Sequence, residues 1–233
     1  MRAPRLNIGI FADGDNPIDF FDEMAKVGHN IRLIDDVTEI NSCELIIISV
    51  AEDRLAETVL YLSGFARRDQ MFLHTCLVHG LEIMDPLELA GCVVMAASPI
   101  SSHRWVTGAV DELGETIVGL LAGELGASIL SIEDSQRGAF AAALDYARFL
   151  GTLAQDARNV LDAFLNDVDL TQHIIDDSIF YSEPLPPLNN VIARYEAIED
   201  PGVKRLFKDL ARRQAEISRA QDIELWAIQK EQL

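Results

Sequence analysis

One short segment constrains the fold of this chain more than any other. Leu45-Ile46-Ile47-Ile48-Ser49-Val50 is almost continuously apolar. Such a run is typical of a strand buried on both faces, as in the centre of a parallel sheet. Similar runs alternate with helical periodicity over residues 1–132, and the predicted strands are Leu6–Phe11, Ile31–Ile34, Leu45–Val50, Met71–Thr75, Cys92–Ala97 and Ser128–Ile132. The alternation predicts an α/β fold with a mostly parallel sheet and helices on both faces.

The segments between the predicted strands carry helix signals. Asn16 is a suitable cap and Pro17 suits a first helical turn, so a helix is predicted to begin there and to end near Gly28. Two further helices are predicted at Asp53–Leu62 and from about Ala109 to Leu125, with Gly126 as the C′ residue of the second.

After residue 133 the strand signals end. Apolar residues recur every three or four positions over Gln136–Leu165, which predicts one long helix, or two with a kink near Gly151. Asp200-Pro201 predicts the cap and first turn of a final amphipathic helix. We therefore predict a first domain over residues 1–133 and an all-helical second domain over residues 134–233.

Composition limits the classes of partner and site. The chain has 38 acidic and 19 basic residues, a formal charge of −19, so its field repels nucleic acids and anionic membranes and we predict neither as a partner. No apolar run approaches the ~20 residues that cross a bilayer, and no signal peptide is recognised, so we predict a cytoplasmic protein. Cys43, Cys76 and Cys92 lack metal-ligand spacing. We predict reduced core thiols and no metal site.

The turn after the first predicted strand resembles a degenerate dinucleotide-binding loop. A Rossmann-type site needs a strand that ends in G-x-G-x-x-G and turns into a helix whose N-terminus faces the diphosphate. Here the turn reads Ala12-Asp13-Gly14-Asp15-Asn16-Pro17. Gly14 alone keeps a glycine of the pattern, and it still permits close backbone approach. Asp13 and Asp15 flank the expected phosphate position, where their charges oppose an anion.

A second feature of dinucleotide sites is present. The next predicted strand ends in Asp35-Asp36, about 20 residues beyond the loop, where an acid accepts the ribose hydroxyls of NAD and repels the extra phosphate of NADP. We predict NAD or NADP as the cofactor. The predicted cofactor-binding residues are Ala12, Asp13, Gly14, Asp15, Asp35, Val50 and Ala51.

The order of these segments from Leu6 to about Leu165 resembles the 6-phosphogluconate-dehydrogenase-like Rossmann superfamily. Within it, the chain is similar to small Rossmann-like proteins related to pyrroline-5-carboxylate reductase and coenzyme-F420-dependent NADP reductase. The segments that carry the resemblance are Ile8-Gly9-Ile10, Glu44–Asp53, Leu73-His74-Thr75, Ala96–Ile100 and the alanine-rich helix from Arg137. The resemblance implies an NAD(P)-dependent dehydrogenase or reductase that associates through its helical part.

Several positions depart from the family's pattern. Cys76-Leu77 stands where the resemblance suggests a small residue and a glycine, and Ser98 stands where relatives often have a histidine before the proline. Phe140–Asp145 lacks the polar or basic catalytic residue of relatives. The remaining candidates are His74, Ser98, Asp145 and Arg148 for catalysis, and His103 and Arg104, in a predicted loop Ser101–Trp105 after the fifth strand, for substrate binding.

Each candidate also has a structural alternative. For His74, a packed or hydrogen-bonded core histidine is the favoured interpretation. For Arg104, a surface arginine without a site role is favoured, and Asp145 and Arg148, three residues apart on a helix, can pair with each other. A basic cluster at Lys204-Arg205, Lys208 and Arg212-Arg213 is interleaved with acids, which favours a solvated or subunit-facing helix over a nucleic-acid site.

Two functions remain open. The first is an NAD(P)-dependent oxidoreductase, with nicotinamide over the carboxyl ends of the first, third and fourth strands and a small-molecule substrate against the long helix. The second is a non-catalytic dimeric binding or regulatory protein that kept the Rossmann shell without the cofactor. The loop residues and Ser98 favour the second. Apolar stripes on the long helix and on the last helix predict a homodimer joined through the helical part.

Overall fold

The computed structural model describes residues 5–13, 18–101, 103–180 and 185–230. The chain divides into two compact units, Met1–Asp145 and Tyr146–Leu233. This division falls inside one long helix. The domain boundary predicted between residues 133 and 134 lies just before that helix begins and stays a prediction.

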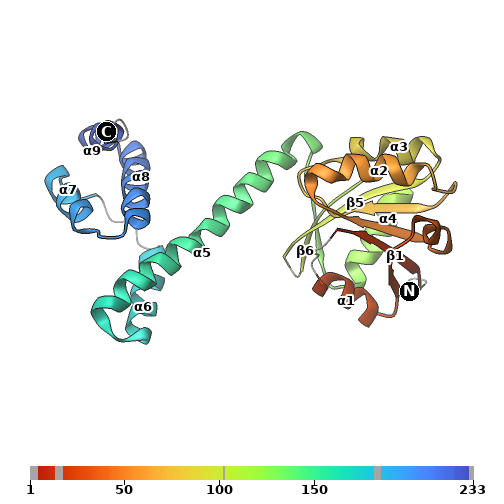
Figure 1. The fold of residues 1–233 in the computed structure, drawn as a ribbon, viewed down its shortest axis with the longest axis horizontal. Helices are drawn as coiled ribbons and strands as arrows, with labels where there is room; N and C mark the ends of the chain where they lie inside the picture. Colours follow the sequence, from red (N-terminus) through yellow and green to blue (C-terminus); the bar gives the residue numbers. More distant parts are fainter. Residues whose placement is uncertain (1–4, 14–17, 102, 181–184, 231–233) are drawn as a thin grey trace. The chain divides into compact units, whose positions relative to one another are not determined.

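The first unit is built on one sheet of seven strands (Figure 1). The strands are β1 (Asn7–Ala12), β2 (Asn30–Leu33), β3 (Leu45–Ser49), β4 (Met71–His74), β5 (Val93–Ser101), β6 (Arg104–Ala109) and β7 (Ser128–Ser131). Their order is β2-β1-β3-β4-β5-β6-β7. Strands β1 to β5 are parallel, β6 is antiparallel to β5, and β7 is parallel to β6. The predicted mostly parallel sheet is confirmed.

Helices cover both faces of the sheet (Figure 1). The α-helices are α1 (Ile18–Lys26), α2 (Leu55–Ser63), α3 (Asp85–Leu89) and α4 (Glu112–Glu124), and the 3-10 helices are η1 (Val37–Ser42), η2 (Glu52–Arg54), η3 (Leu81–Met84) and η4 (Asp134–Gln136). Helices α1 and α4 pack on one face and α2 and α3 on the other. The three cysteines are buried and form no disulfide, as predicted, and they lie in the core between the sheet and helices α2 and α3; they are Cys43, Cys76 and Cys92.

The helix ends follow the turn chemistry of the sequence. Gly28 and Gly126 have φ angles of 106° and 65°, a left-handed conformation that glycine adopts without strain and that ends the helices before them. Asp111 caps α4, because its carboxylate accepts the N–H of Gly114 at 2.7 Å. Helix α4 therefore begins later than predicted. The predicted cap at Asn16-Pro17 lies outside the described residues.

The predicted loop Ser101–Trp105 was wrong at both ends, because β5 extends to Ser101 and Arg104 and Trp105 are the first residues of β6. Strand β6 was not predicted. Trp105 and Val106 of this strand are buried, at 2% and 0% exposure. Aromatic and β-branched side chains of this kind are typical of strands, and here they fill the core.

Residues beyond Gln136 are helical wherever regular structure is described. The helices are α5 (Arg137–Leu165), α6 (Val168–Phe180), α7 (Leu188–Ala197), α8 (Pro201–Ser218) and α9 (Gln221–Gln229). Helix α5 continues through Gly151 as one element. The carboxylate of Asp200 caps α8 by accepting the N–H groups of Gly202 and Val203, which confirms the predicted cap.

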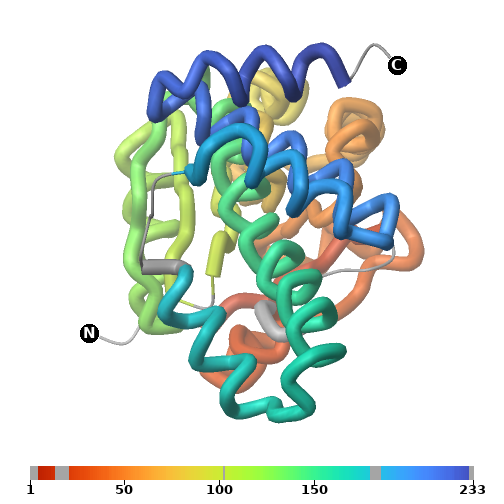
Figure 2. The backbone as a smooth tube through the Cα atoms, turned by 90° about the vertical axis from the view of Figure 1, so that its left-hand side faces the viewer, coloured from red at the N-terminus to blue at the C-terminus, as the bar shows by residue number. Residues whose placement is uncertain are grey.

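Helices α7, α8 and α9 lie next to one another (Figure 2). Their buried side chains form a small core of their own. The Tyr195 and Trp226 rings meet edge to face at 5.3 Å between centroids. Four of the five basic residues of α8 pair with acids, and the pairs are Lys204–Glu196, Lys208–Asp209, Arg212–Glu216 and Arg213–Glu216. Across the described residues, every helix is too short or too polar to span a membrane.

Candidate functional site

The strand order creates one switch point in the parallel part of the sheet. Strands β2 and β3 lie on opposite sides of β1, so the connections that leave the carboxyl ends of β1 and β3 diverge there. In open α/β sheets, ligands bind in the crevice at such a point. The last residue of β1, Ala12, pairs with Ser49 at the end of β3. Asp13 and Val50, which directly follow the two strands, therefore lie at this switch point.

Asp13 joins the segments that follow these two strands. Its carboxylate accepts the backbone N–H of Ala51 at 3.0 Å and the guanidinium of Arg54 at 2.9 Å. The Asp13 side chain is 18% exposed and that of Arg54 is 58% exposed, so the ion pair lies at the rim. The structure thus brings together two predicted cofactor-binding residues, Asp13 and Ala51. It also adds Arg54, which balances the charge expected to repel a phosphate and which the sequence interpretation missed.

Three other predicted cofactor-binding residues, Ala12, Val50 and Asp35, lie at or just after the ends of β1, β3 and β2. Ala12 and Val50 are half-buried at the ends of β1 and β3. Asp35 follows β2 and is exposed, whereas Asp36 caps η1. The backbone N–H of Thr38 donates to Asp36, which holds the pKa of the Asp36 carboxyl below its ordinary value. Of the two acids, Asp35 is therefore the one not committed to a cap. Gly14 and Asp15 lie outside the described residues.

His74 closes the carboxyl end of β4 and is fully buried. Its Nε2 contacts the carbonyl oxygen of Gly80 at 3.2 Å, and since a carbonyl only accepts, Nε2 carries the proton. Burial, and next the positive charge of Arg137, lower the pKa of His74 to about 4. Among the described residues, its Nδ1 has no hydrogen-bond partner. His74 is therefore a neutral core histidine near pH 7.

The sequence interpretation also missed Arg137, whose side chain is fully buried at the start of α5. Its Nε donates to Asp134 Oδ1 at 2.7 Å and its Nη2 to the carbonyl oxygen of Thr107 at 3.3 Å. Nη1 has no partner among the described residues. A cation opposes the helix dipole at a helix N-terminus. An arginine at the start of a predicted helix, three residues after an aspartate, is therefore the sequence signal that could have indicated a paired, buried arginine.

Asp134 connects Arg137 to the loop after β4. Its Oδ2 accepts the backbone N–H of Leu81 at 2.9 Å. Partial burial raises the pKa of the Asp134 carboxyl. The hydrogen bonds from Leu81 and Arg137 and the charge of Arg137 lower it by more, so the net pKa is below the ordinary value. The carboxylate therefore stays ionised and holds Leu81 and Arg137 together.

The remaining candidates are distributed over separate elements. Ser98 is buried and its hydroxyl donates to the carbonyl oxygen of Cys76 at 2.8 Å, which is a structural contact. His103 and Arg104 are exposed at the β5–β6 turn, and His103 accepts the N–H of Ser128 through its carbonyl oxygen. Asp145 and Arg148 are exposed on α5. In the described part of the chain, no three His, Cys, Asp or Glu side chains gather as a metal site requires.

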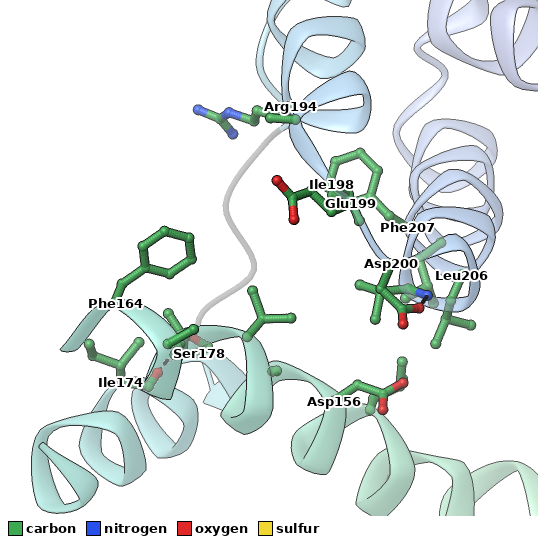
Figure 3. Close-up of a pocket in the computed structure, with 18 residues that line it drawn as sticks. Asp156, Phe164, Ile174, Ser178, Arg194, Ile198, Glu199, Asp200, Leu206 and Phe207 are labelled. Carbon is green, nitrogen blue, oxygen red and sulfur yellow. Dashed lines mark hydrogen bonds between the residues drawn. The ribbon is translucent and has the colours of Figure 1, made fainter. Parts of the chain in front are cut away.

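The helical unit contains a wide apolar groove (Figure 3). Its volume is about 1190 Å³, and α5, α6, α7 and α8 contribute to its lining. Phe164 and Ile174 lie on one side and Leu206 and Phe207 on the other. Phe164 is 81% exposed. The lining has the character of an uncovered protein core.

Comparison with known proteins identifies the helical part first. Residues 133–230 match the family model described as 6-phosphogluconate dehydrogenase C-terminal domain-like. The predicted superfamily resemblance is confirmed. A comparison with curated protein sequences gives no match.

Several solved structures share the fold over nearly the whole chain. A candidate NADP oxidoreductase from Bacteroides fragilis is 15% identical with a TM-score of 0.69, over 91% of this chain and 98% of that one. Pyrroline-5-carboxylate reductase of Streptococcus pyogenes is 11% identical with a TM-score of 0.61, over 98% and 99%. Plasmodium falciparum pyrroline carboxylate reductase, whose structure holds NADP, is 9% identical with a TM-score of 0.57, over 97% and 95%. These similarities establish a Rossmann-like fold with a helical C-terminal part.

Proposed function

We propose that the chain is an NAD(P)-dependent oxidoreductase that acts on a small molecule and whose phosphate-binding loop is degenerate. The observation that carries this proposal is the switch point between β1 and β3, where Asp13 holds the segments after these strands together through Ala51 and Arg54. Dinucleotides bind at this place in sheets of this type. The structurally similar reductases give independent support.

The acidic turn does not exclude a diphosphate. The Arg54 guanidinium lies 2.9 Å from the Asp13 carboxylate, so the pair presents little net charge to a ligand. Arg54 is more exposed than Asp13 and can also approach an anion at the rim. Asp35, exposed after β2, favours NAD over NADP because a carboxylate accepts ribose hydroxyls and repels a 2′-phosphate.

A second candidate function rests on the catalytic candidates themselves. His74 and Ser98 are both buried and both bonded to carbonyl oxygens of the loop after β4. Neither is placed to exchange a proton with a substrate in this arrangement. This observation favours a non-catalytic binding or regulatory protein that keeps the Rossmann shell. Hydride transfer asks mainly for positioning by the protein, so the enzyme proposal survives the loss of an acid or base.

We propose in addition that a second copy of the chain covers the helical unit. Within Arg137–Leu165, all of which is described, Arg137 alone is buried. The apolar side chains of α5 that stay exposed are Tyr146, Phe149, Leu150, Val160 and Phe164. A surface this apolar in a water-soluble protein marks an interface, and two-fold pairing of identical chains is the commonest way to bury one.

Titration with NAD, NADH, NADP and NADPH, followed by the fluorescence of the reduced nicotinamides and by thermal denaturation, tests the cofactor. The oxidoreductase proposal expects saturable binding of at least one nucleotide, with NAD(H) ahead of NADP(H). A ligand at a hundred times its Kd stabilises the folded state by about 2.7 kcal/mol, which raises the melting temperature measurably. If none of the four changes either signal, the enzyme proposal falls and the non-catalytic one stands.

A further inference from the structure

The loop between β4 and η3, residues 75–80, is tied to the switch point on one side. The His79 ring donates through Nε2 to the carbonyl oxygen of Glu52 at 3.2 Å. Glu52 opens η2, the same short helix that ends in Arg54, and it directly follows Ala51. The loop therefore contacts the segment that Asp13 holds.

On its other side the same loop is tied to the start of α5. The carbonyl oxygen of Gly80 accepts a hydrogen bond from His74 Nε2, and the N–H of Leu81 donates to Asp134. Asp134 in turn holds the buried guanidinium of Arg137, the first residue of α5. A continuous series of short contacts thus runs from Glu52 through His79, Gly80 and Leu81 to Asp134 and Arg137.

Two glycines pack closely against the carboxylate of Asp134 and the guanidinium of Arg137. A Cβ atom at Gly80 would overlap the carboxylate of Asp134. A Cβ atom at Gly108 would lie 3.0 Å from Nη2 of Arg137. The backbone at Gly80 therefore packs directly against the Asp134 carboxylate, and a displacement of the loop at Gly80 would change that contact.

The series nevertheless has unused hydrogen-bonding capacity at its buried end. Among the described residues, Nδ1 of His74 and Nη1 of Arg137 have no partner. One atom is an acceptor and the other a donor, and unsatisfied buried groups are costly.

We propose that this series is a latch that couples the turn after β3 to the first turns of α5. A ligand that moves Glu52 at the switch point changes the contacts of Asp134 and Arg137 and thereby the order of the α5 N-terminus. That the natural ligand is a nucleotide rests on the proposed function. The coupling itself rests only on the contacts within the first unit.

Hydrogen–deuterium exchange of the ligand-free protein tests the coupling. His79→Phe keeps a ring but cannot donate to Glu52. The latch predicts faster exchange, by about tenfold, at Leu81 and also at the backbone amides of residues 141–144, the first of α5 to be bonded within the helix. His173→Phe is the matched control, since the His173 ring contacts the carbonyl oxygen of Asp169 in α6, outside the series. It should leave both segments unchanged.

The reverse direction uses Asp134→Asn, which keeps an acceptor for Leu81 and loses the ion pair with Arg137. The latch predicts faster exchange at residues 52–54, and unchanged exchange there overturns it. The latch is also overturned if His79→Phe affects Leu81 and leaves residues 141–144 unchanged.

Nucleotide titration separates the two proposals. If no nucleotide binds while both variants behave as expected, the proposed function fails and the latch stands. If NADH or NADPH protects residues 50–54 and leaves residues 141–144 unaffected, the function stands and the latch fails.

Discussion

The carboxylate of Asp13 accepts the backbone N–H of Ala51, 38 residues further along the chain, at the only switch point among the parallel strands that the structure describes. The same carboxylate pairs with Arg54. A residue that reads in the sequence as an obstacle to phosphate binding is thus also the contact that joins the segments that follow β1 and β3. Its charge and its hydrogen bond can be separated by substitution.

Asp13→Asn should tighten nucleotide binding. The amide oxygen still accepts the N–H of Ala51, but the negative charge is gone and Arg54 is released toward the diphosphate. Unit charges a few ångströms apart in water interact by about 1 kcal/mol, so the Kd for the preferred nucleotide should fall roughly fivefold. Fluorescence titration at low ionic strength measures the change.

Arg54→Gln is the matched control for that variant. It leaves Asp13 without its counter-charge and should weaken binding by a similar factor. High salt should reduce both effects, because both are electrostatic and lie near the surface. Weaker binding in Asp13→Asn would show that the charge of Asp13 supports the site.

His74 should make stability depend on pH. Its pKa is lowered to about 4 in the folded protein, against an ordinary value of 6.5, so between these values the unfolded chain binds more protons. Stability is therefore complete above about pH 6.5 and is lost as the pH falls toward 4. The shift corresponds to roughly 3 kcal/mol at 1.36 kcal/mol per pKa unit.

Urea unfolding at about pH 7 and about pH 4.5 checks this for the wild type and for His74→Gln, which does not titrate. Carboxylates such as Asp36, Asp134 and Glu196 also have lowered pKa values and contribute in the same direction at still lower pH, in both proteins. The variant should lose most of the difference between the two conditions. An equal difference in both proteins would remove His74 as its source.

Gly80→Ala should destabilise the first unit. The added methyl group overlaps the Asp134 carboxylate, and overpacking of this kind costs about 1–3 kcal/mol. Gly119→Ala is the matched control, because a Cβ there meets nothing within 4 Å and alanine is the better helix former by about 0.5–1 kcal/mol. Urea midpoints should move in opposite directions, and equal shifts would contradict the packing described at Gly80.

The helical unit should form a homodimer that two charges disrupt. Phe149 and Phe164 are 58% and 81% exposed on α5. Phe149→Glu combined with Phe164→Glu should convert a dimer into a monomer in sedimentation at micromolar concentration, because buried unpaired carboxylates are costly. Leu89→Glu, in α3 and 89% exposed in the wild type, should remain dimeric. A wild-type monomer would remove the dimer proposal.

Much of the fold could be predicted because its signals are local. The six predicted strands follow from short apolar and β-branched runs. The almost continuously apolar Leu45–Val50 contains β3, Leu45–Ser49, which is the middle one of the five parallel strands and is buried at every residue. The hairpin partner β6 was not predicted, because Arg104–Ala109 has polar and small residues at its ends and its antiparallel pairing with β5 is a tertiary relationship.

The candidate site was predictable only in part. The turn containing Asp13 and the segment at Ala51 were identified by their positions after strands. The partners Arg54 and Leu81 were not, since each meets its carboxylate across more than 40 residues of chain. The burial of Arg137 could not be predicted, because a charged helix residue is ordinarily solvated. The only indication in the sequence was its electrostatically unfavourable position at a helix N-terminus.

Binding of a dinucleotide at the switch point between β1 and β3 is tested by hydrogen–deuterium exchange of the wild-type protein with and without saturating NADH. We expect protection at residues 50–54 and near Asp35, with residues 204–217 of α8 unchanged. Saturable binding that protects another segment and leaves residues 50–54 unaffected, or no binding at all, would contradict it.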